Sequence, residues 1–393
     1  MGSNSQKSQD NILEIGRDSV EILRHLIRIN TTNPPGNEKR AAEWIRDLLQ
    51  PHGFRCRVQD IGNNRANLIA TLGEGKPELM LNGHLDVVPA TGEWTNDPFD
   101  SFDDGDLLYG RGAADMKSGV AAMCAAAIQV ADQHLPMHGT LRLVFVADEE
   151  CSNEGTKAYL KSYDPADYAL IGEPTKLEIC VAHRGVSRDY IDIIDEPRHA
   201  ALPASEDSVS KMVAVISLIE DYNRKLKAVQ HPILPPPSIS ITMVEGYEKD
   251  NTVPGKIRLL LDYRILPHTS HEQIVSGLKQ MFENAGYSDY KIVPHFYMPG
   301  GEINPSDAFV KMCLDIKREV VAPDDPVLAH AFDASCEQCF YSENGVKTIV
   351  CGPGDLSQAH TIDEHVSKTQ VRMAEQYYFQ VICRLLGVEK QVS

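Results

Sequence analysis

The chain has 393 residues and a net charge of −18, with 42% hydrophobic and 24% charged residues. This length and composition are ordinary for a globular protein with a large core and room for two domains. The acidic balance argues against a surface for nucleic acid or an anionic membrane, and no apolar run is long enough to span a bilayer.

Apolar periodicity divides the first half of the chain into alternating helices and strands. Strand-like runs occur at NLIATL, ELMLNGHL, LRLVFVAD and YALIGE, and helical spacing is found at 18–31, 38–50, 117–133 and 155–163. The alternation predicts an α/β domain with a largely parallel sheet. Sites in open α/β sheets form outside the carboxyl ends of the strands, so the strand ends are where we look for chemistry.

From about residue 186 the pattern changes. RDYIDIID, SISITMV, KIRLLLDYRIL and KIVPHFY are typical of strands, and 205–228 and 270–286 of helices. Their order, β-α-β-β-α-β, is that of a ferredoxin-like unit. A helix near 306–320, the strand TIVCG and a helix at 367–386 return to the first pattern. We therefore predict a discontinuous α/β domain, residues 1–185 and 298–393, with an α+β domain inserted at 186–297.

The start of the chain and its cysteines indicate in which cellular compartment we expect the protein. The polar start MGSNSQKSQDN lacks the apolar centre of a signal peptide. Nine cysteines, an odd number, are scattered along the chain, which favours reduced thiols in the cytoplasm. Cys336 and Cys339 form a single CxxC pair, which is weak for zinc and is interpreted as structural.

Polar residues recur where the predicted strands give way to loops. They are His84, Asp86, Asp115, Glu149, Glu150, Glu173 and His360. Each has a plain alternative, because Asp115 could cap a helix, the three glutamates could be solvated acids, and His360 could be a loop histidine. Taken together, imidazole and carboxylate groups suit one site for zinc, and also for cobalt or manganese.

Five segments in this order resemble the M20 metallopeptidases: HLDVVP, GRGAADMKSG, DEE, GEPT and GPGDLSQAHTIDEHV. The resemblance extends over nearly the whole chain, including NPPGNE and DPF. That group includes acetylornithine deacetylase, succinyl-diaminopimelate desuccinylase and aminoacylase. The resemblance implies a zinc-peptidase-like α/β catalytic domain with an inserted ferredoxin-like lid, which usually serves dimerisation. A homodimer through the lid is therefore expected.

The resemblance also implies two zinc ions, with cobalt or manganese as alternatives. The implied ligands are His84, Asp115, Glu150, Glu173 and His360. Asp115 would bridge the ions, His84 and Glu173 would complete one site, and Glu150 and His360 the other.

Further roles carried over from the family do not involve binding metal. Glu149 would be the general base that takes a proton from the attacking water. Asp86 is expected to orient His84, because metal-bound histidines usually donate their other ring N–H to a carboxylate.

The resemblance also implies roles for three residues of the inserted lid, where the flanking sequence diverges from the family. RHAALP, 198–203, resembles the family's HSSxP motif with both serines replaced by alanine, so His199 would stabilise the oxyanion of a partner subunit. Asn251 and Arg264 would bind the substrate carboxylate, although a strand-face salt bridge is nearly as good an interpretation of Arg264.

These expectations converge on a dinuclear amide hydrolase that releases the acyl group from an N-acyl amino acid. A dipeptidase or carboxypeptidase of the same fold is the alternative, since the same metal centre cleaves both bonds. A metal-binding but catalytically silent protein and a purely acidic scaffold are hypotheses of other classes. The chain also departs from the family, with Ser335 where an arginine is common, so the acyl group is not predicted.

Overall fold

The computed structural model describes residues 18–134, 136–202, 206–323 and 326–388. These residues form two compact units. Unit 2 comprises Ala182–Glu302 and Ala331–Ser335, and unit 1 comprises the described residues before, between and after these segments. Among the described residues, no helix is long and apolar enough to cross a lipid bilayer.

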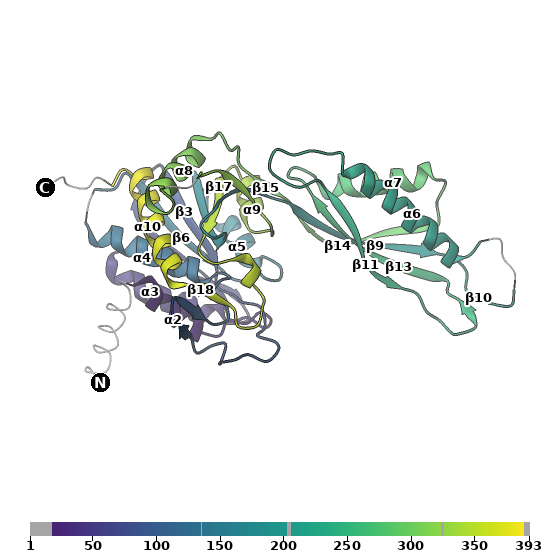
Figure 1. The fold of residues 1–393 in the computed structure, drawn as a ribbon, viewed down its shortest axis with the longest axis horizontal. Helices are drawn as coiled ribbons and strands as arrows, with labels where there is room; N and C mark the ends of the chain where they lie inside the picture. Colours follow the sequence, from purple (N-terminus) through teal and green to yellow (C-terminus); the bar gives the residue numbers. More distant parts are fainter. Residues whose placement is uncertain (1–17, 135, 203–205, 324–325, 389–393) are drawn as a thin grey trace. The chain divides into compact units, whose positions relative to one another are not determined.

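A twisted sheet with the strand order β1-β2-β6-β3-β7-β17-β8 forms the centre of unit 1 (Figure 1). The four central strands β6, β3, β7 and β17 are parallel to one another, whereas β1, β2 and β8 are joined antiparallel. The prediction of a largely parallel sheet is therefore correct for the centre and wrong for the edges. The strands are β1 (Arg55–Gly62), β2 (Arg65–Glu74), β3 (Glu78–His84), β6 (Gly139–Val146), β7 (Tyr168–Pro174), β8 (Ile179–His183) and β17 (Lys347–Gly352).

Helices cover both faces of this sheet, with α4 and α10 on one side and α5 and α9 on the other (Figure 1). Six of them lie close to the predicted helices, and the short α9 was not predicted. The helices are α2 (Ser19–Arg28), α3 (Glu38–Leu49), α4 (Lys117–Asp132), α5 (Glu154–Ser162), α8 (Ala308–Val320), α9 (Gln338–Glu343) and α10 (Lys368–Leu385), with single turns η1 (Gln50–His52) and η2 (Leu356–Gln358).

Helix α4 is buried around its whole circumference, and every residue from Lys117 to Ile128 is buried. A helix that is apolar on all sides belongs in the interior, and α4 packs against β3 and β7 with α2 and α10 on its outer side. Gly119 permits this packing, because a Cβ there would lie 2.2 Å from the backbone oxygen of Gly172 in β7. The N-terminus of α4 therefore lies close to the carboxyl end of β7.

A small antiparallel sheet of β4 (Phe102–Asp104), β5 (Leu107–Tyr109) and β18 (His365–Ser367) joins two distant parts of unit 1. Its register pairs His365 with Tyr109. The segment that follows His360 is thereby held beside the segment that precedes Asp115.

Unit 2 has the order β-α-β-β-α-β and a four-stranded antiparallel sheet arranged β11-β13-β9-β14. Burial alternates along β13, and its buried residues pack with both helices in a core that includes Ile219, Leu259, Leu278 and Phe282. The elements are β9 (Gly185–Ile194), α6 (Ser208–Leu226), β11 (Ser238–Glu245), β13 (Lys256–Ile265), α7 (His271–Asn284) and β14 (Tyr290–Met298), with short strands β10 (Arg198–His199), β12 (Thr252–Val253) and β15 (Gly301–Glu302). The short strand β16 (Ala329–Phe332) lies partly in each unit.

Candidate metal centre

The predicted ligands gather at one edge of the unit 1 sheet. Because β6, β3, β7 and β17 are adjacent and mutually parallel, their carboxyl ends meet there. The ligands come from these ends and from the loop before α4: His84 ends β3, Glu150 follows β6, Glu173 is the penultimate residue of β7, His360 follows β17 through η2, and Asp115 precedes α4.

Asp115 lies between the two histidines and presents one carboxylate oxygen to each. Its Oδ1 is 3.1 Å from Nε2 of His84, and its Oδ2 is 3.4 Å from Nε2 of His360. Glu173 accompanies His84, with 3.7 Å between Oε1 and Nε2, and Glu150 accompanies His360 at 3.1 Å. The five side chains therefore form two groups that share one aspartate.

Charge is unevenly distributed in this centre. Burial alone would lower the pKa of His84, but the hydrogen bond with Asp115 and the charge of Glu173 raise it well above its usual value. Hydrogen bonds with Asp115 and Glu150 raise the pKa of His360 to about 10. Burial and the charge of Asp115 raise the pKa of Glu173. The raised pKa values of the two imidazoles thus reflect a concentration of carboxylate groups around them.

A glutamate that the sequence analysis did not single out, Glu337, lies beside this centre. One oxygen each of Glu149, Glu173 and Glu337 lies within 4.8 Å of the others. Glu337 is fully buried at the start of α9, and neither of its oxygens has a hydrogen-bond partner among the described residues. Burial, above all, raises its pKa to about 7. The only signal in the sequence was its place inside the CxxC segment.

The donor set fits divalent metal. His84, Asp115 and Glu150 offer ligand atoms within 4.8 Å of one another, and zinc is bound by imidazole nitrogen and carboxylate oxygen. Buried carboxylates without counter-charge are costly, so the orphaned oxygens of Glu337 also indicate that the centre is built around a cation. The residues present therefore fit a bound divalent metal ion.

Asp86 contacts Nδ1 of His84 chiefly through its main chain. Nδ1 of His84 donates to the backbone oxygen of Asp86 at 2.9 Å, whereas the Asp86 carboxylate is 3.7 Å away. The carboxylate instead accepts the backbone N–H groups of Glu149 and Glu150, each at 3.1 Å. The backbone oxygen of Asp86 thus holds Nδ1 of His84, which leaves Nε2 facing the centre. The carboxylate of Asp86 holds the loop that carries Glu149 and Glu150.

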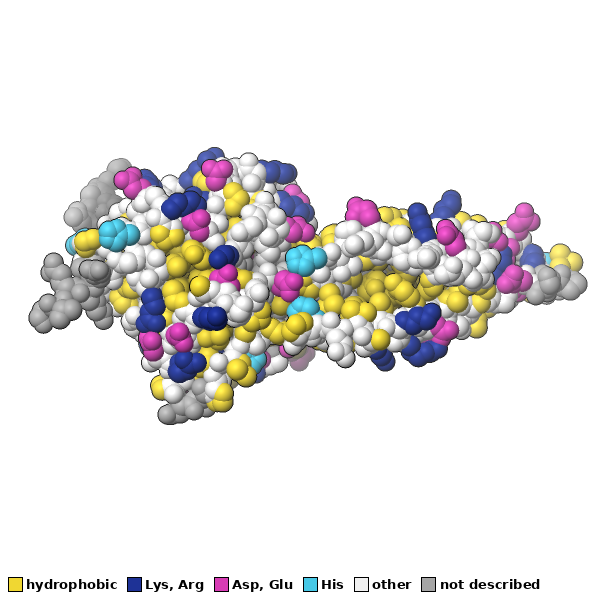
Figure 2. All heavy atoms as spheres, turned by 90° about the horizontal axis from the view of Figure 1, so that it is seen from above, with side chains coloured by type: hydrophobic (Ala, Val, Ile, Leu, Met, Phe, Trp, Pro, Cys, Tyr) yellow, Lys and Arg dark blue, Asp and Glu magenta, His cyan; other side chains and the backbone are white. Residues whose placement is uncertain are grey.

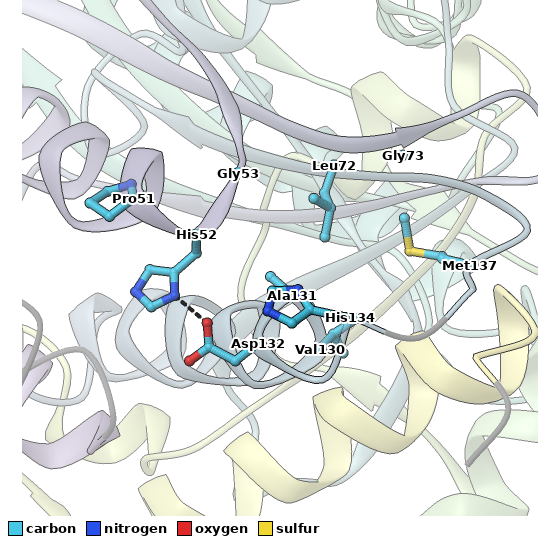
Figure 3. Close-up of a pocket in the computed structure, with 10 residues that line it drawn as sticks. All are labelled: Pro51, His52, Gly53, Leu72, Gly73, Val130, Ala131, Asp132, His134 and Met137. Atoms are coloured by element: carbon cyan, nitrogen blue, oxygen red, sulfur yellow. Dashed lines mark hydrogen bonds and ion pairs between the residues drawn. The ribbon is translucent and has the colours of Figure 1, made fainter. Parts of the chain in front are cut away.

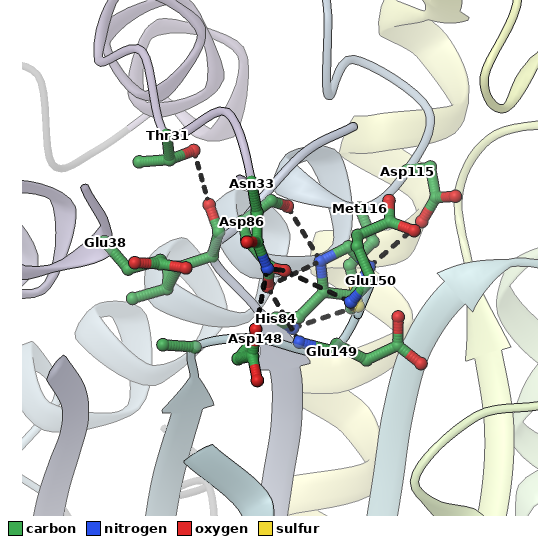
Figure 4. Close-up of polar contacts among 12 residues, drawn as sticks. Thr31, Asn33, Glu38, His84, Asp86, Asp115, Met116, Asp148, Glu149 and Glu150 are labelled. Carbon is green, nitrogen blue, oxygen red and sulfur yellow. Dashed lines mark hydrogen bonds and ion pairs between the residues drawn. The ribbon is translucent and has the colours of Figure 1, made fainter. Parts of the chain in front are cut away.

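Asn33 connects this loop to a second buried carboxylate, as Figure 4 shows. Its side-chain nitrogen donates to the carboxylates of Asp86 and Asp148, both at 2.9 Å, and its side-chain oxygen accepts from the guanidinium of Arg65. Arg65 also donates to Asp148, whose φ of 69° lies in the left-handed region that side chains rarely adopt. The NPPGNE segment, noted in the sequence without a role, therefore supplies a support for the loop.

The three predicted lid residues all lie in unit 2. Nε2 of the exposed His199 is 3.3 Å from the Asn251 side-chain nitrogen, because β10 and β12 pair there. Arg264 donates from Nε to Asp262 at 2.7 Å and is 40% exposed. The ion-pair alternative for Arg264 is therefore present, and its role toward substrate stays a prediction. Pro203 of the motif lies outside the described residues.

Two other features do not belong to the predicted ligand set. Cys336 and Cys339 are both buried, and burial raises the pKa of both thiols, which fits a structural role. A cavity of about 930 Å³ is lined by segments around η1, β2 and the end of α4, with His52 paired to Asp132 at its side (Figure 3). It shares no residue with the metal centre.

Comparison with known proteins connects this geometry to one family. Residues 80–384 match the model described as Peptidase family M20/M25/M40. The chain is 26% identical over 388 residues to the probable succinyl-diaminopimelate desuccinylase of Staphylococcus aureus (strain MRSA252), covering 90% of this chain and 93% of that protein. It is 29% identical over 356 residues to acetylornithine deacetylase of Pectobacterium carotovorum subsp. carotovorum (strain PC1), covering 87% and 88%.

Solved structures show the same fold. Aminopeptidase PepT from Bacillus cereus ATCC 10987 aligns with a TM-score of 0.76 and 18% identity, covering 95% of this chain and 100% of that one. A dinuclear metal-binding M20 peptidase from Bacillus subtilis aligns with a TM-score of 0.71 and 16% identity, covering 96% and 99%.

Proposed function

Because the chain belongs to peptidase family M20/M25/M40 and is therefore a metal-dependent hydrolase, we propose that it releases the acyl group from N-acyl amino acids. The placement of Asp115 supports the dinuclear part of this proposal, and the similarity to a desuccinylase and a deacetylase supports the choice of substrate. One aspartate faces two imidazoles through different oxygens, and each imidazole has its own glutamate. Such a set suits two ions that share a carboxylate, and zinc, cobalt and manganese all accept these ligands.

The ligand roles follow from the pairing. His84 and Glu173 would bind one ion, Glu150 and His360 the other, and Asp115 both. Two ions held by these residues would supply Lewis-acid polarisation of the scissile carbonyl and would lower the pKa of the attacking water.

Glu149 is assigned the proton transfer. It neighbours Glu150 in the same loop, but it groups with Glu173 and Glu337 rather than with the two histidines. Burial, above all, raises the pKa of Glu149 well above its usual value. A carboxylate with a raised pKa accepts the proton of the water and can return it to the leaving amine. The hydrogen bond from the backbone N–H of Glu149 to Asp86 fixes the position of the main chain that carries this carboxylate.

Residues of unit 2 would recognise the substrate. Arg264 would bind the amino-acid carboxylate, for which its two-pronged guanidinium is well suited. His199, already placed beside Asn251, would donate to the carbonyl oxygen as negative charge develops there. We assign His199 to the centre of a partner subunit.

A homodimer formed through unit 2 would bring His199 to that centre. Helix α6 exposes Val209 and Val213, 42% and 57% accessible, and hydrophobic side chains gather on the face of unit 2 in Figure 2. Exposed apolar groups of this kind suit an interface between copies. Sedimentation that finds only monomer at micromolar concentration would remove His199 from this role.

The decisive experiment measures amine release from matched N-acetyl, N-succinyl and dipeptide substrates. Chelator-treated protein is assayed before and after zinc or cobalt is added, and Glu149→Gln protein serves as the inactive control. Metal-restored release from the N-acyl compounds supports the proposal. Release from dipeptides alone would favour a dipeptidase, and two bound metals without release from any class would favour a silent relative.

A further inference from the structure

Glu364 is a fully buried carboxylate whose hydrogen bonds all go to the segment that carries Asp115. Its Oε1 accepts the backbone N–H groups of Ala114 at 2.8 Å and Asp115 at 2.9 Å. Its Oε2 accepts the N–H of Gly112 at 3.1 Å and pairs with Arg111 at 2.6 Å. Both oxygens are therefore saturated by four donors from one five-residue segment.

The same glutamate lies four residues after His360. The connection is short and is held at its far end by β18, which pairs with β5. The backbone N–H of Gly110 also donates to the backbone oxygen of Glu364 at 2.9 Å. Two loops that are about 250 residues apart in sequence are thus joined through this one residue, and each carries a ligand.

The remaining contacts hold the carboxylate in place. Arg111 is also fully buried, and its guanidinium lies 5.0 Å from the ring centre of Trp94. The neighbouring Thr95 donates to the Asp363 carboxylate from its backbone N–H at 2.9 Å and from its hydroxyl at 2.7 Å. The loop of His360 is therefore anchored on both sides of Glu364.

We propose that Glu364 is a positioning residue that sets the distance between Asp115 and His360, and thereby the binding of the ion those two residues share. This inference rests on the proposed dinuclear centre. Glu364 does not itself face the ligand atoms, because its oxygens are occupied by backbone donors. It acts through the main chain of Asp115 on one side and through the four-residue connection to His360 on the other.

The competing explanation is that Glu364 and Arg111 form a buried ion pair that only stabilises the fold. Unit 1 offers a matched control for that explanation. Glu78 lies at the opposite end of β3 from His84, is 8% exposed, and pairs with Arg142 at 2.9 Å. Glu78→Gln therefore also breaks a buried glutamate–arginine pair, but at a position distant along the strand from the ligands.

The test compares wild type, Glu364→Gln and Glu78→Gln as full-length proteins. The glutamine at 364 is nearly isosteric, yet its NH₂ group must face backbone donors that the carboxylate accepted. For each protein we would measure urea unfolding without metal, cobalt(II) affinity by equilibrium dialysis, and the visible absorption of the cobalt-saturated protein. The absorption bands report the geometry around cobalt and do not depend on turnover.

We expect Glu364→Gln to bind the second cobalt ion about 10- to 100-fold more weakly, the range found for groups that orient metal ligands, and to change the absorption bands. Glu78→Gln should lower stability and leave affinity and bands unchanged. Equal affinity and bands in Glu364→Gln and wild type would overturn the inference, whatever the stability. If Glu364→Gln does not fold, Glu364→Asp, which is one methylene shorter, should show the same loss of affinity for the second cobalt ion.

The outcome for wild type separates this inference from the proposed function. Wild type that binds no cobalt overturns the dinuclear centre itself. Wild type that binds two ions, beside a Glu364→Gln variant that binds them equally well, overturns only the role of Glu364.

Discussion

The backbone N–H of Glu149 donates to the carboxylate of Asp86 across 3.1 Å. The other oxygen of the same carboxylate accepts the N–H of the next residue, Glu150. Because the two glutamates are consecutive, their side chains leave the loop in different directions. The loop that carries the proposed base Glu149 and the proposed ligand Glu150 is therefore anchored at both residues.

The first prediction concerns this division of labour. Glu149→Ala should retain both metal ions and lower kcat by about 10²- to 10⁴-fold, the usual contribution of a general base. Glu150→Ala should lose one ion, because His360 then has only Asp115 beside it. Metal analysis after gel filtration and a turnover assay check both. Equal metal content and full rates in the two variants would contradict the assignment.

The second prediction concerns Asn33, whose amide donates to two buried carboxylates. Asn33→Asp is nearly isosteric but replaces the donor by an acceptor. We expect the free energy of unfolding to fall by about 1–3 kcal/mol, the cost of unsatisfied buried groups, with a lower kcat. Urea unfolding and turnover test this. A variant with lowered stability but unchanged kcat would show that the loop does not depend on Asn33.

The third prediction is a pH dependence. Glu38 is fully buried, neither of its oxygens has a hydrogen-bond partner among the described residues, and burial raises its pKa to about 7. Since the folded chain holds this proton more tightly than the unfolded chain, the stabilisation is complete below pH 4.5 and is lost as the pH rises through 7. Glu38→Gln, which stays neutral, should be more stable than wild type at pH 8 by on the order of 1–3 kcal/mol.

Urea unfolding of the metal-free proteins at pH 5 and pH 8 measures this difference. The advantage of Glu38→Gln should shrink at pH 5, where the wild-type carboxyl is largely protonated. Glu21→Gln, which changes an exposed glutamate of α2, serves as the control and should show no such pH dependence. An advantage of the same size at both pH values would contradict the raised pKa.

The fourth prediction separates substrate binding from ion pairing in unit 2. Arg264 and Arg188 both pair with Asp262, at 2.7 and 2.9 Å, and both are about 40% exposed. Exposed pairs contribute little stability, so either alanine variant should fold normally. Only Arg264→Ala should raise KM, by at least tenfold, for substrates with a free carboxylate. Equal KM values in the two variants would assign Arg264 to the ion pair alone.

The sequence predicted the elements that have a strong period and the ligands that follow strands. Helix α4 was expected at 117–133 and spans Lys117–Asp132, because its apolar residues and flanking glycines are local signals. Strand ends, turn residues and motifs that resemble a family singled out five candidate ligands, which the structure brings together: His84, Asp115, Glu150, Glu173 and His360.

The supports of the centre could not be found in that way. Asn33 contacts residues 53 and 115 positions away, and Glu364 contacts residues about 250 positions away. Such partners leave no periodic trace in one sequence, since hydrogen bonds across a fold depend on how strands are ordered. Glu337 was missed for the opposite reason, because its neighbours Cys336 and Cys339 offered a more familiar pattern.

The order of the central sheet has a consequence for how the chain matures during synthesis. β17 lies between β7 and β8 in the sheet, yet the ribosome makes it only after the whole of unit 2. At roughly 5–20 residues per second, the partial sheet waits about ten to thirty seconds for its missing strand. His360 follows later still. A nascent chain can thus complete unit 2 while the edge of β7 remains unpaired, which is the interval in which a chaperone would be most useful.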